Sequence, residues 1–247
     1  MHRFYADASG VLDGLARLSD EDARHATRVL RLGAGDEIEL IAPPDRFLAR
    51  IEQADEAGVL ARIEQPLPST EARTRVTLYQ GLPKADKMDW IVQKATELGA
   101  CAVRPVAMER SIVRLEGKDA ERRTQRWQKI AREAVKQCAR IETPEVLPCE
   151  KLAALRKELR ALDLLIVPWE DARDGSVREC LAQVEDLPEA RVGVLIGPEG
   201  GISAKEAAWL CEEAGARLVT LGPRILRTET AGLCALSAIM ALRGELE

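Results

Sequence analysis

Two loops rich in glycine and proline near the C-terminus constrain the fold of this chain most strongly. Leu195–Ser203 (LIGPEGGIS) and Leu221–Ala231 (LGPRILRTETA) each follow a short apolar run and precede a helical pattern. Glycine lets backbone approach a ligand closely, and proline fixes a turn. Two such strand–loop–helix corners, about 25 residues apart, predict neighbouring loops at one end of a parallel sheet. Open α/β sheets bind ligands at that end.

The pattern after residue 75 supports this prediction. We expect strands over 75–82, 101–108, 162–167, 192–196 and 217–221, and helices over 86–98, 119–137 and 228–242. Strands that alternate with helices are typical of a parallel α/β sheet.

The first 70 residues have a different pattern of apolar and polar positions. Near-alternating apolar positions predict short strands over 36–41, 46–51 and 58–63, and Ser19 can cap one helix. This pattern predicts a small β-barrel in residues 1–70. The prolines of segment 65–70 suggest a linker to a second domain over 71–247.

The charge of the chain is unevenly distributed. The net charge of −5 taken alone argues against a nucleic-acid partner, but residues 104–140 carry 11 Lys and Arg against 5 Asp and Glu. Such a local basic stripe is compatible with an RNA-binding surface. A solvated helix face is the alternative.

The six cysteines form no Cys-x-x-Cys pair, and the chain has only two histidines to join them. This composition argues against a metal site, so we expect reduced, buried thiols. The sequence shows no signal-peptide pattern and no apolar run long enough to span a membrane, which predicts a cytoplasmic protein.

The first loop matches neither the dinucleotide-binding nor the P-loop pattern. Ser203 and Glu206 have the spacing of a capping box, so the loop should lead into a helix N-terminus with free N–H donors. Such donors suit an adenine edge or ribose hydroxyls. A tight connection without a ligand is the alternative, and Glu199 could either bind a ribose or favour the helix dipole.

The two loops resemble the second and third motifs of the SPOUT, or trefoil-knot, methyltransferases. More narrowly, they resemble the RsmE family of 16S ribosomal RNA uridine-N3 methyltransferases. Further similar segments are 25–31 (HATRVLR), 87–99 (KMDWIVQKATELG), 109–111 (ERS) and 126–131 (RWQKIA). The resemblance covers nearly the whole chain. It implies a PUA-like RNA-binding barrel over 1–70 and an α/β SPOUT domain with a C-terminal trefoil knot over 71–247.

The resemblance also implies a cofactor and its site. The cofactor is S-adenosylmethionine, with no metal, and the first of the three loops that hold it matches Val167–Glu170 here. The implied cofactor-binding residues are Pro168, Leu195, Ile196, Gly197, Pro198, Glu199, Gly200, Gly201, Leu221, Gly222, Pro223, Leu226, Thr228, Glu229 and Thr230. Thr228 can also cap the final helix.

The implied partner is 16S ribosomal RNA or the small ribosomal subunit. The candidate RNA-binding residues are His25, Arg28, Arg31, Arg110, Arg122, Arg123, Arg126 and Arg140. The family usually shows a Glu-Gln-Ser/Cys-Gly-Arg pattern that ends at the position of Arg140, whereas this chain has Lys136 and Ala139 in place of Glu and Gly. This departure puts any role of that Glu in doubt but leaves Gln137 and Arg140 in position.

The implied chemistry defines what the catalytic residues must do. N3 of uracil is protonated at neutral pH and becomes a good nucleophile only after it loses its proton. The site therefore needs a base, or a cation that stabilises the deprotonated ring. Arg224 is the first candidate for this cation and Arg227 the second; a salt bridge to Glu199 or Glu229 is the alternative for either. No histidine lies near these loops, and the general base is not identified.

The final helix, 231–242, is apolar nearly all round and must be buried. By analogy with related enzymes we expect a homodimer held largely by this helix. If Leu236 faces the partner, its replacement with Glu should dissociate or unfold the protein. Two other functions stay open: a SPOUT tRNA 2′-O-methyltransferase, and a non-catalytic RNA-binding module that has kept the fold.

Overall fold

The computed structural model describes residues 1–55 and 57–246, apart from the side chain of Ala8. The chain divides into two compact units, Met1–Glu71 with Ala139–Glu142, and Ala72–Cys138 with Thr143–Glu247.

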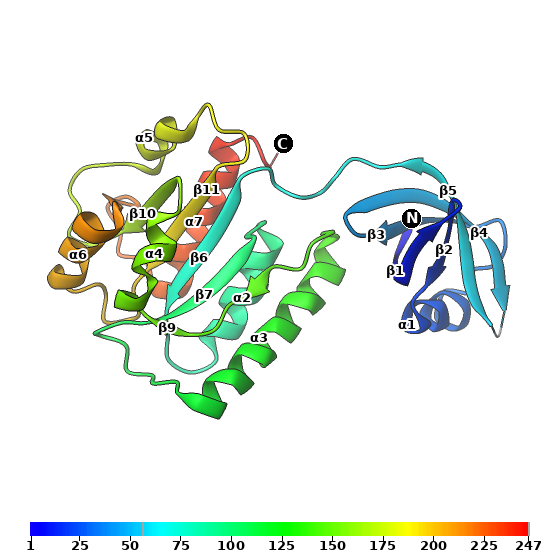
Figure 1. The fold of residues 1–247 in the computed structure, drawn as a ribbon, viewed down its shortest axis with the longest axis horizontal. Coiled ribbons are helices and arrows are strands. Elements are labelled where there is room, and N and C mark those ends of the chain that lie inside the picture. The colour runs from blue at the N-terminus through cyan, green and yellow to red at the C-terminus, as the bar shows by residue number, and fades with distance from the viewer. Residues whose placement is uncertain (56, 247) are drawn as a thin grey trace. The chain divides into compact units, whose positions relative to one another are not determined.

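The first unit is a closed barrel with the strand order β1-β2-β5-β4-β3 (Figure 1). Its strands are β1 (His2–Leu12), β2 (Leu15–Leu18), β3 (Glu37–Ala42), β4 (Asp45–Asp55) and β5 (Gly58–Pro66). Strands β1 and β3 pair in parallel, and the other neighbours pair antiparallel. Phe4, Ile38 and Leu40 fill the interior. The barrel and three of its strands are as the sequence predicts, whereas β1 and β2 were missed.

One helical segment lies beside the barrel strands. It consists of α1 (Asp20–Arg24) and a π-helical turn, η1 (His25–Val29). The Ser19 side chain accepts a hydrogen bond from the backbone N–H of Asp22 at 3.2 Å, which confirms the predicted cap.

The second unit contains a seven-stranded sheet with the order β12-β10-β11-β6-β7-β8, with β9 also paired to β7. Its strands are β6 (Arg75–Gly81), β7 (Ala102–Ala107), β8 (Glu145–Val146), β9 (Glu150–Lys151), β10 (Leu164–Pro168), β11 (Arg191–Ile196) and β12 (Arg217–Val219). Every pairing in this sheet is parallel, as predicted.

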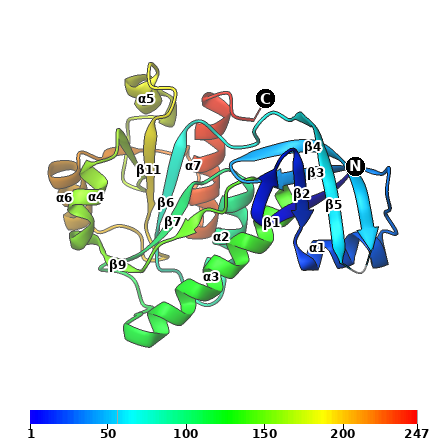
Figure 2. The same cartoon turned by 45° about the vertical axis from the view of Figure 1, so that its right-hand side comes forward.

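Helices cover both faces of this sheet (Figures 1 and 2). They are α2 (Lys87–Glu97), α3 (Gly117–Cys138), α4 (Arg156–Arg160), α5 (Val177–Leu181), α6 (Ala204–Ala214) and α7 (Thr228–Leu242), with 3-10 turns η2 (Leu152–Leu155) and η3 (Ala182–Val184). Val194 points into the cluster formed with α2, α3, α5 and α7, and Leu195 points into the cluster formed with α4 and α6. This alternation gives a three-layer arrangement.

Helix α7 has the predicted bounds, but Leu236 does not lie on a face that a partner could contact. Leu236 and Ile239 are fully buried in the core of their own unit. The outer side of α7 carries small residues instead, with Cys234 and Ala241 exposed.

All six cysteines are free, but the expectation that they are buried holds only for Cys180. Cys211 and Cys234 are exposed, and the other three are half-buried. No helix within the described residues is long and apolar enough to cross a membrane.

Candidate functional site

A pocket of about 280 Å³ lies where three parallel strands end. Strands β12, β10 and β11 are neighbours in the sheet, so the segments that follow them meet at one edge. Pro168–Glu170, Ile196–Ile202 and Thr220–Thr228 supply most of the lining. The ligand-binding edge that the sequence predicts is therefore present as a pocket.

The loop after β11 requires glycine at several positions. A Cβ atom on Gly197 would lie 2.8 Å from the side chain of Ile202, and one on Gly200 would lie 2.9 Å from Arg110. Gly201 has a φ of +74°, and its missing Cβ leaves room for the Glu170 carboxylate. The loop therefore packs closely against Ile202 and Arg110, while its backbone on the pocket side is accessible to a ligand.

Hydrogen bonds hold the three segments together. The backbone N–H of Trp169 donates to the Val219 carbonyl, and its indole N–H donates to the Ile202 carbonyl, both at 3.1 Å. The Thr228 hydroxyl donates to the Gly197 carbonyl at 2.6 Å and accepts from the Gln80 amide at 2.8 Å. Arg227 occupies the N-cap position of α7, so the prediction that Thr228 caps this helix is wrong.

The capping box predicted after the loop is confirmed. The Ser203 hydroxyl accepts from the Glu206 backbone N–H, and the Glu206 carboxylate accepts from the Ser203 N–H, each at 3.2 Å. Glu109 reaches the same corner, where its carboxylate accepts from the Ser203 hydroxyl at 2.9 Å.

Most of the predicted cofactor-binding residues line this pocket. Those that do are Pro168, Ile196, Gly197, Pro198, Glu199, Gly201, Leu221, Gly222, Leu226 and Thr228. Those outside the lining are Leu195, Gly200, Pro223, Glu229 and Thr230. Leu195 is buried on the other side of β11, and Gly200 packs against Arg110.

Both candidate catalytic arginines, Arg224 and Arg227, line the pocket. The loop between them is open to solvent, with the Ile225 side chain 79% exposed. No ion pair to either arginine occurs among the residues that the structure describes. Glu199 and Glu229 pair with Lys87 instead, at 3.0 Å and 3.1 Å, so the alternative salt bridges are not formed.

Sequence reasoning missed Lys87 as a lining residue, and it included Trp169 and Glu170 only as part of the expected first loop, not as individual binding residues. Trp169 and Glu170 lie in the segment expected to form the first loop, so their position after a strand was an available signal. Lys87 begins α2, 142 residues before Glu229, and no local pattern links the two.

The candidate RNA-binding residues of the barrel unit lie in and directly after η1. His25 and Arg28 belong to η1, and Arg31 follows it with a φ of +58°. All three side chains are exposed. In the other unit, Arg110 packs against Gly200 in the loop after β11, and its guanidinium donates to the Gly200 carbonyl at 3.0 Å.

The structure does not support a surface role for Arg140. Its side chain is 6% exposed and forms an ion pair with Glu71 at 2.5 Å. Glu71 also accepts from the backbone N–H of Ile141 at 2.7 Å and that of Glu142 at 3.1 Å. Arg140 therefore stabilises the barrel unit, and its buried, paired side chain does not support the predicted contact with RNA.

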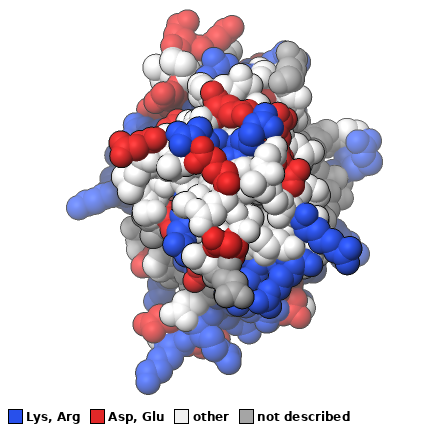
Figure 3. All heavy atoms as spheres, turned by 90° about the vertical axis from the view of Figure 1, so that its right-hand side faces the viewer, with Lys and Arg blue, Asp and Glu red and all other residues white. Residues whose placement is uncertain are grey.

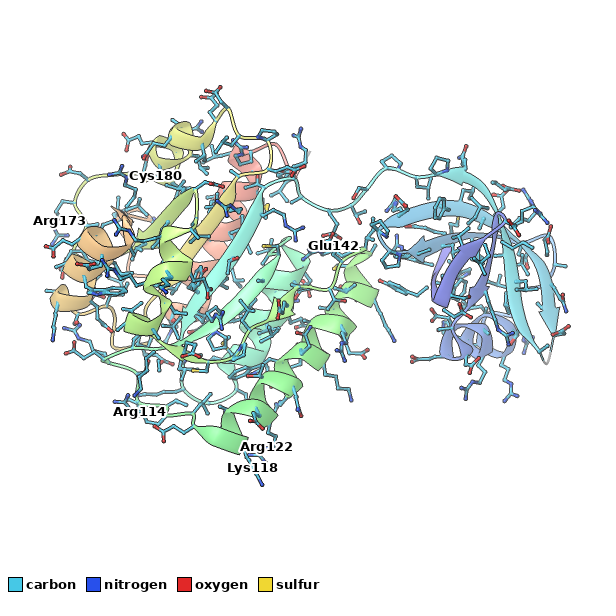
Figure 4. The ribbon with its side chains drawn as sticks, viewed as in Figure 1. Arg114, Lys118, Arg122, Glu142, Arg173 and Cys180 are labelled. Carbon is cyan, nitrogen blue, oxygen red and sulfur yellow. The ribbon has the colours of Figure 1, made fainter. Side chains whose placement is uncertain are left out.

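The three candidate RNA-binding arginines of α3 each form an ion pair with an aspartate. Arg122 and Arg123 pair with Asp119, and Arg126 pairs with Asp89. A helix of 3.6 residues per turn places positions 118, 122, 125, 129, 132 and 136 on one face, which holds five cations and one Gln. Lys118 and Arg122 lie near the N-terminal end of this face (Figure 4). We name this face the α3 ridge.

Charges of both signs occur elsewhere on the surface, and Figure 3 shows acidic and basic side chains spread together over one face. Within the described residues, no cluster of His, Cys, Asp and Glu could hold a metal ion.

The pocket fits a charged adenosine derivative such as S-adenosylmethionine. Ile196, Leu221 and Leu226 offer apolar surface for a base, and the glycine loop offers backbone groups for its edge. The carboxylates of Glu170 and Glu199 offer acceptors for hydroxyl or ammonium groups.

Two family models match the chain. One, described as an RNA methyltransferase domain, matches residues 70–240, and one, described as an RNA methyltransferase PUA domain, matches residues 18–64.

Curated relatives are similar over nearly the whole length. The Ribosomal RNA small subunit methyltransferase E of Bacillus subtilis is 38% identical over 228 residues, which cover 90% of this chain and 88% of that protein. The protein of the same name from Mycobacterium tuberculosis is 33% identical over 245 residues, covering 97% and 91%.

Solved structures are similar as well. A Ribosomal RNA small subunit methyltransferase E from Neisseria gonorrhoeae, bound to S-adenosyl methionine, is 33% identical with a TM-score of 0.74, covering 98% of both chains. A putative methyltransferase from Legionella pneumophila, in complex with the cofactor SAM, is 30% identical with a TM-score of 0.73, covering 97% and 96%.

Proposed function

Because the chain belongs to the ribosomal RNA small subunit methyltransferase E (RsmE) family, we propose that it methylates N3 of one uridine in 16S ribosomal RNA. At the coarser level it is an RNA methyltransferase that uses S-adenosylmethionine. The observation that supports the uridine proposal best is the position of two arginines, Arg224 and Arg227, on a pocket that fits the cofactor, where neither forms an ion pair with any residue that the structure describes.

When bound, S-adenosylmethionine supplies an electrophilic methyl group. The chain's own residues would hold it through the backbone of Ile196–Gly201 and Leu221–Gly222, and through the side chains of Leu226 and Thr228. The hydrogen bonds of Trp169 and Thr228 hold these segments in place before a ligand binds. Less conformational entropy is then lost on binding. The trefoil knot that the family implies would add further rigidity.

Arg224 and Arg227 would contact the RNA substrate, not the cofactor. A guanidinium beside the target base stabilises the deprotonated uracil more than the neutral one, so it favours the transition state. Arg224 is the better candidate because it lies on the exposed part of the loop next to Ile225. Arg227 sits at the N-cap of α7 and would contact the base or a phosphate.

The remaining candidate roles concern partners. The barrel unit and the α3 ridge would bind the RNA backbone, with His25, Arg28 and Arg31 on the barrel. We further propose a homodimer in which the outer side of α7, around Cys234, meets a second copy.

A methylation assay tests the uridine proposal. Purified protein is incubated with methyl-labelled S-adenosylmethionine and either assembled small subunits or free 16S ribosomal RNA that lacks the modification. The RNA is then digested to nucleosides. We expect label in 3-methyluridine, and the better substrate identifies the natural partner. Label in a 2′-O-methylated nucleoside, or in none, would contradict the proposal.

A further inference from the structure

Lys87 joins two carboxylates at the rim of the cofactor pocket. Its ammonium lies 3.0 Å from Glu199 Oε1 and 3.1 Å from Glu229 Oε2. Glu199 belongs to the loop after β11, and Glu229 belongs to the first turn of α7. Lys87 and Glu199 line the pocket, and the three side chains keep 28%, 25% and 20% of their surface exposed. We name these three residues the rim triad.

All three groups of the rim triad are charged at neutral pH. Hydrogen bonds to Glu199 and Glu229 raise the pKa of Lys87. Burial alone would raise the pKa of Glu199, but hydrogen bonds from the Lys84 backbone and from Lys87 outweigh it, so the pKa lies below its usual value. Burial also opposes ionisation of Glu229, yet local hydrogen bonds and Lys87 lower its pKa. The triad therefore carries a net charge of about −1 instead of the −2 of two free carboxylates.

Glu199 does not depend on Lys87 for its position. The backbone N–H of Lys84 donates to both of its oxygens, at 3.0 Å and 3.3 Å. If the Lys87 ammonium were removed, the Glu199 carboxylate would remain at the rim without a countercharge. Lys87 consequently affects the charge of the pocket more than the position of the loop that carries Glu199.

The charge of the pocket matters because methyl transfer removes the positive charge of the cofactor. The nucleophile's electron pair would form a new bond to the methyl carbon while the methyl–sulfur bond breaks with its electron pair left on sulfur, so a sulfonium would become a neutral thioether. Uncompensated carboxylates near the pocket would stabilise the sulfonium before transfer more than the transition state, in which its charge is declining. Such ground-state stabilisation slows transfer.

We propose that Lys87, by pairing with Glu199 and Glu229, limits how strongly the pocket prefers the positively charged cofactor over its neutral product. Lys87 thus acts on the ligand preference through the charge of two carboxylates. The inference rests on the proposed use of S-adenosylmethionine at this site, and it adds a residue that tunes the balance between substrate and product.

Calorimetry on the full-length protein tests the proposal without any measurement of activity. The affinities for S-adenosylmethionine and S-adenosylhomocysteine are measured for the wild type and for Lys87→Met. We expect the preference for the charged ligand to rise roughly five- to tenfold in Lys87→Met, as two carboxylates lose their countercharge. Lys84→Met is the matched control, because it removes an exposed lysine from the same segment and keeps the backbone N–H. Its preference should equal that of the wild type.

A charge-matched rescue separates this role from direct contact with the ligand. Lys87→Met/Glu229→Gln leaves Glu199 as the one charged group, so the net charge stays at about −1, and the ligand preference should return to within about twofold of wild type. Lys87→Arg keeps the countercharge and should behave like the wild type.

Three results would overturn the inference: an unchanged preference in Lys87→Met, an equal loss of affinity for both ligands, or no rescue in Lys87→Met/Glu229→Gln. Failure of the wild type to bind either ligand would instead refute the proposed cofactor.

Discussion

At the scale of single residues, Arg224 and Lys87 differ in how their charges are balanced. Lys87 is paired with two carboxylates, whereas Arg224 lines the pocket with no ion-pair partner among the described residues. A free guanidinium can respond to charge that develops on a substrate, since no fixed partner competes for it. Arg224 is therefore the residue whose loss should affect methyl transfer most.

Replacing Arg224 with Ala should slow single-turnover methyl transfer by roughly 100- to 1,000-fold, the usual cost of losing one transition-state contact. Cofactor affinity, measured by calorimetry, should change by less than about twofold because backbone groups dominate that site. Arg224→Lys should restore only part of the rate, since an ammonium lacks the planar fork.

The assay pH supplies a further control for Arg224. If the arginine assists deprotonation of the uracil, a higher pH should restore part of the rate of Arg224→Ala. Transfer at the wild-type rate by this variant would exclude Arg224 from the mechanism.

At the scale of elements, local signals predicted most of what the structure shows. Helix α7 has its predicted bounds, and the loops after β11 and β12 were identified because glycine and proline mark backbone geometry directly. Strands β1 and β2 were missed because small and polar residues interrupt their alternation. The burial of Arg140 and the rim triad could not be predicted, since their partners lie far away in sequence.

The α3 ridge gives a prediction about RNA binding. The variant Lys118→Gln/Lys129→Gln/Arg132→Gln removes three exposed cations from one helix face. It should weaken RNA binding and reduce the slope of log affinity against log salt by about 2 to 3, as expected when three phosphate contacts are lost. Filter binding over a salt series measures both effects.

A matched variant provides the control for the α3 ridge. Lys157→Gln/Arg160→Gln/Lys205→Gln removes the same charge from α4 and α6, which pack on the opposite face of the sheet. It should bind RNA nearly as the wild type does. Equal salt slopes for the two triple variants would mean that the α3 ridge is only a solvated helix face.

The residue after α3 gives a prediction about stability. Ala139 has a φ of +69°, a conformation that costs an L-residue roughly 1–2 kcal/mol and costs glycine little. The variant Ala139→Gly should raise the free energy of unfolding by about 0.5–1 kcal/mol, after subtraction of the extra chain entropy of glycine. Chemical denaturation measures it. A loss of stability would show that the Ala139 methyl group contributes more packing than strain.

At the scale of the whole molecule, the proposed homodimer can be tested through two exposed thiols. Light scattering should give a dimer at micromolar concentration. Maleimide should then modify Cys211 on α6 quickly and Cys234 on α7 slowly, because the second copy covers the outer side of α7. Cys234→Arg should shift the protein toward monomer while circular dichroism stays unchanged. A stable wild-type monomer, or equal reactivity of the two thiols, would refute this interface.

The central claim is that this chain transfers a methyl group to N3 of a uridine in small-subunit ribosomal RNA. The most direct measurement is mass spectrometry of 16S ribosomal RNA nucleosides from a strain that lacks the gene, with and without complementation. We predict that 3-methyluridine is absent from the deletion strain, returns with the wild-type gene and stays strongly reduced with Arg224→Ala. An unchanged level of 3-methyluridine in the deletion strain would contradict the claim.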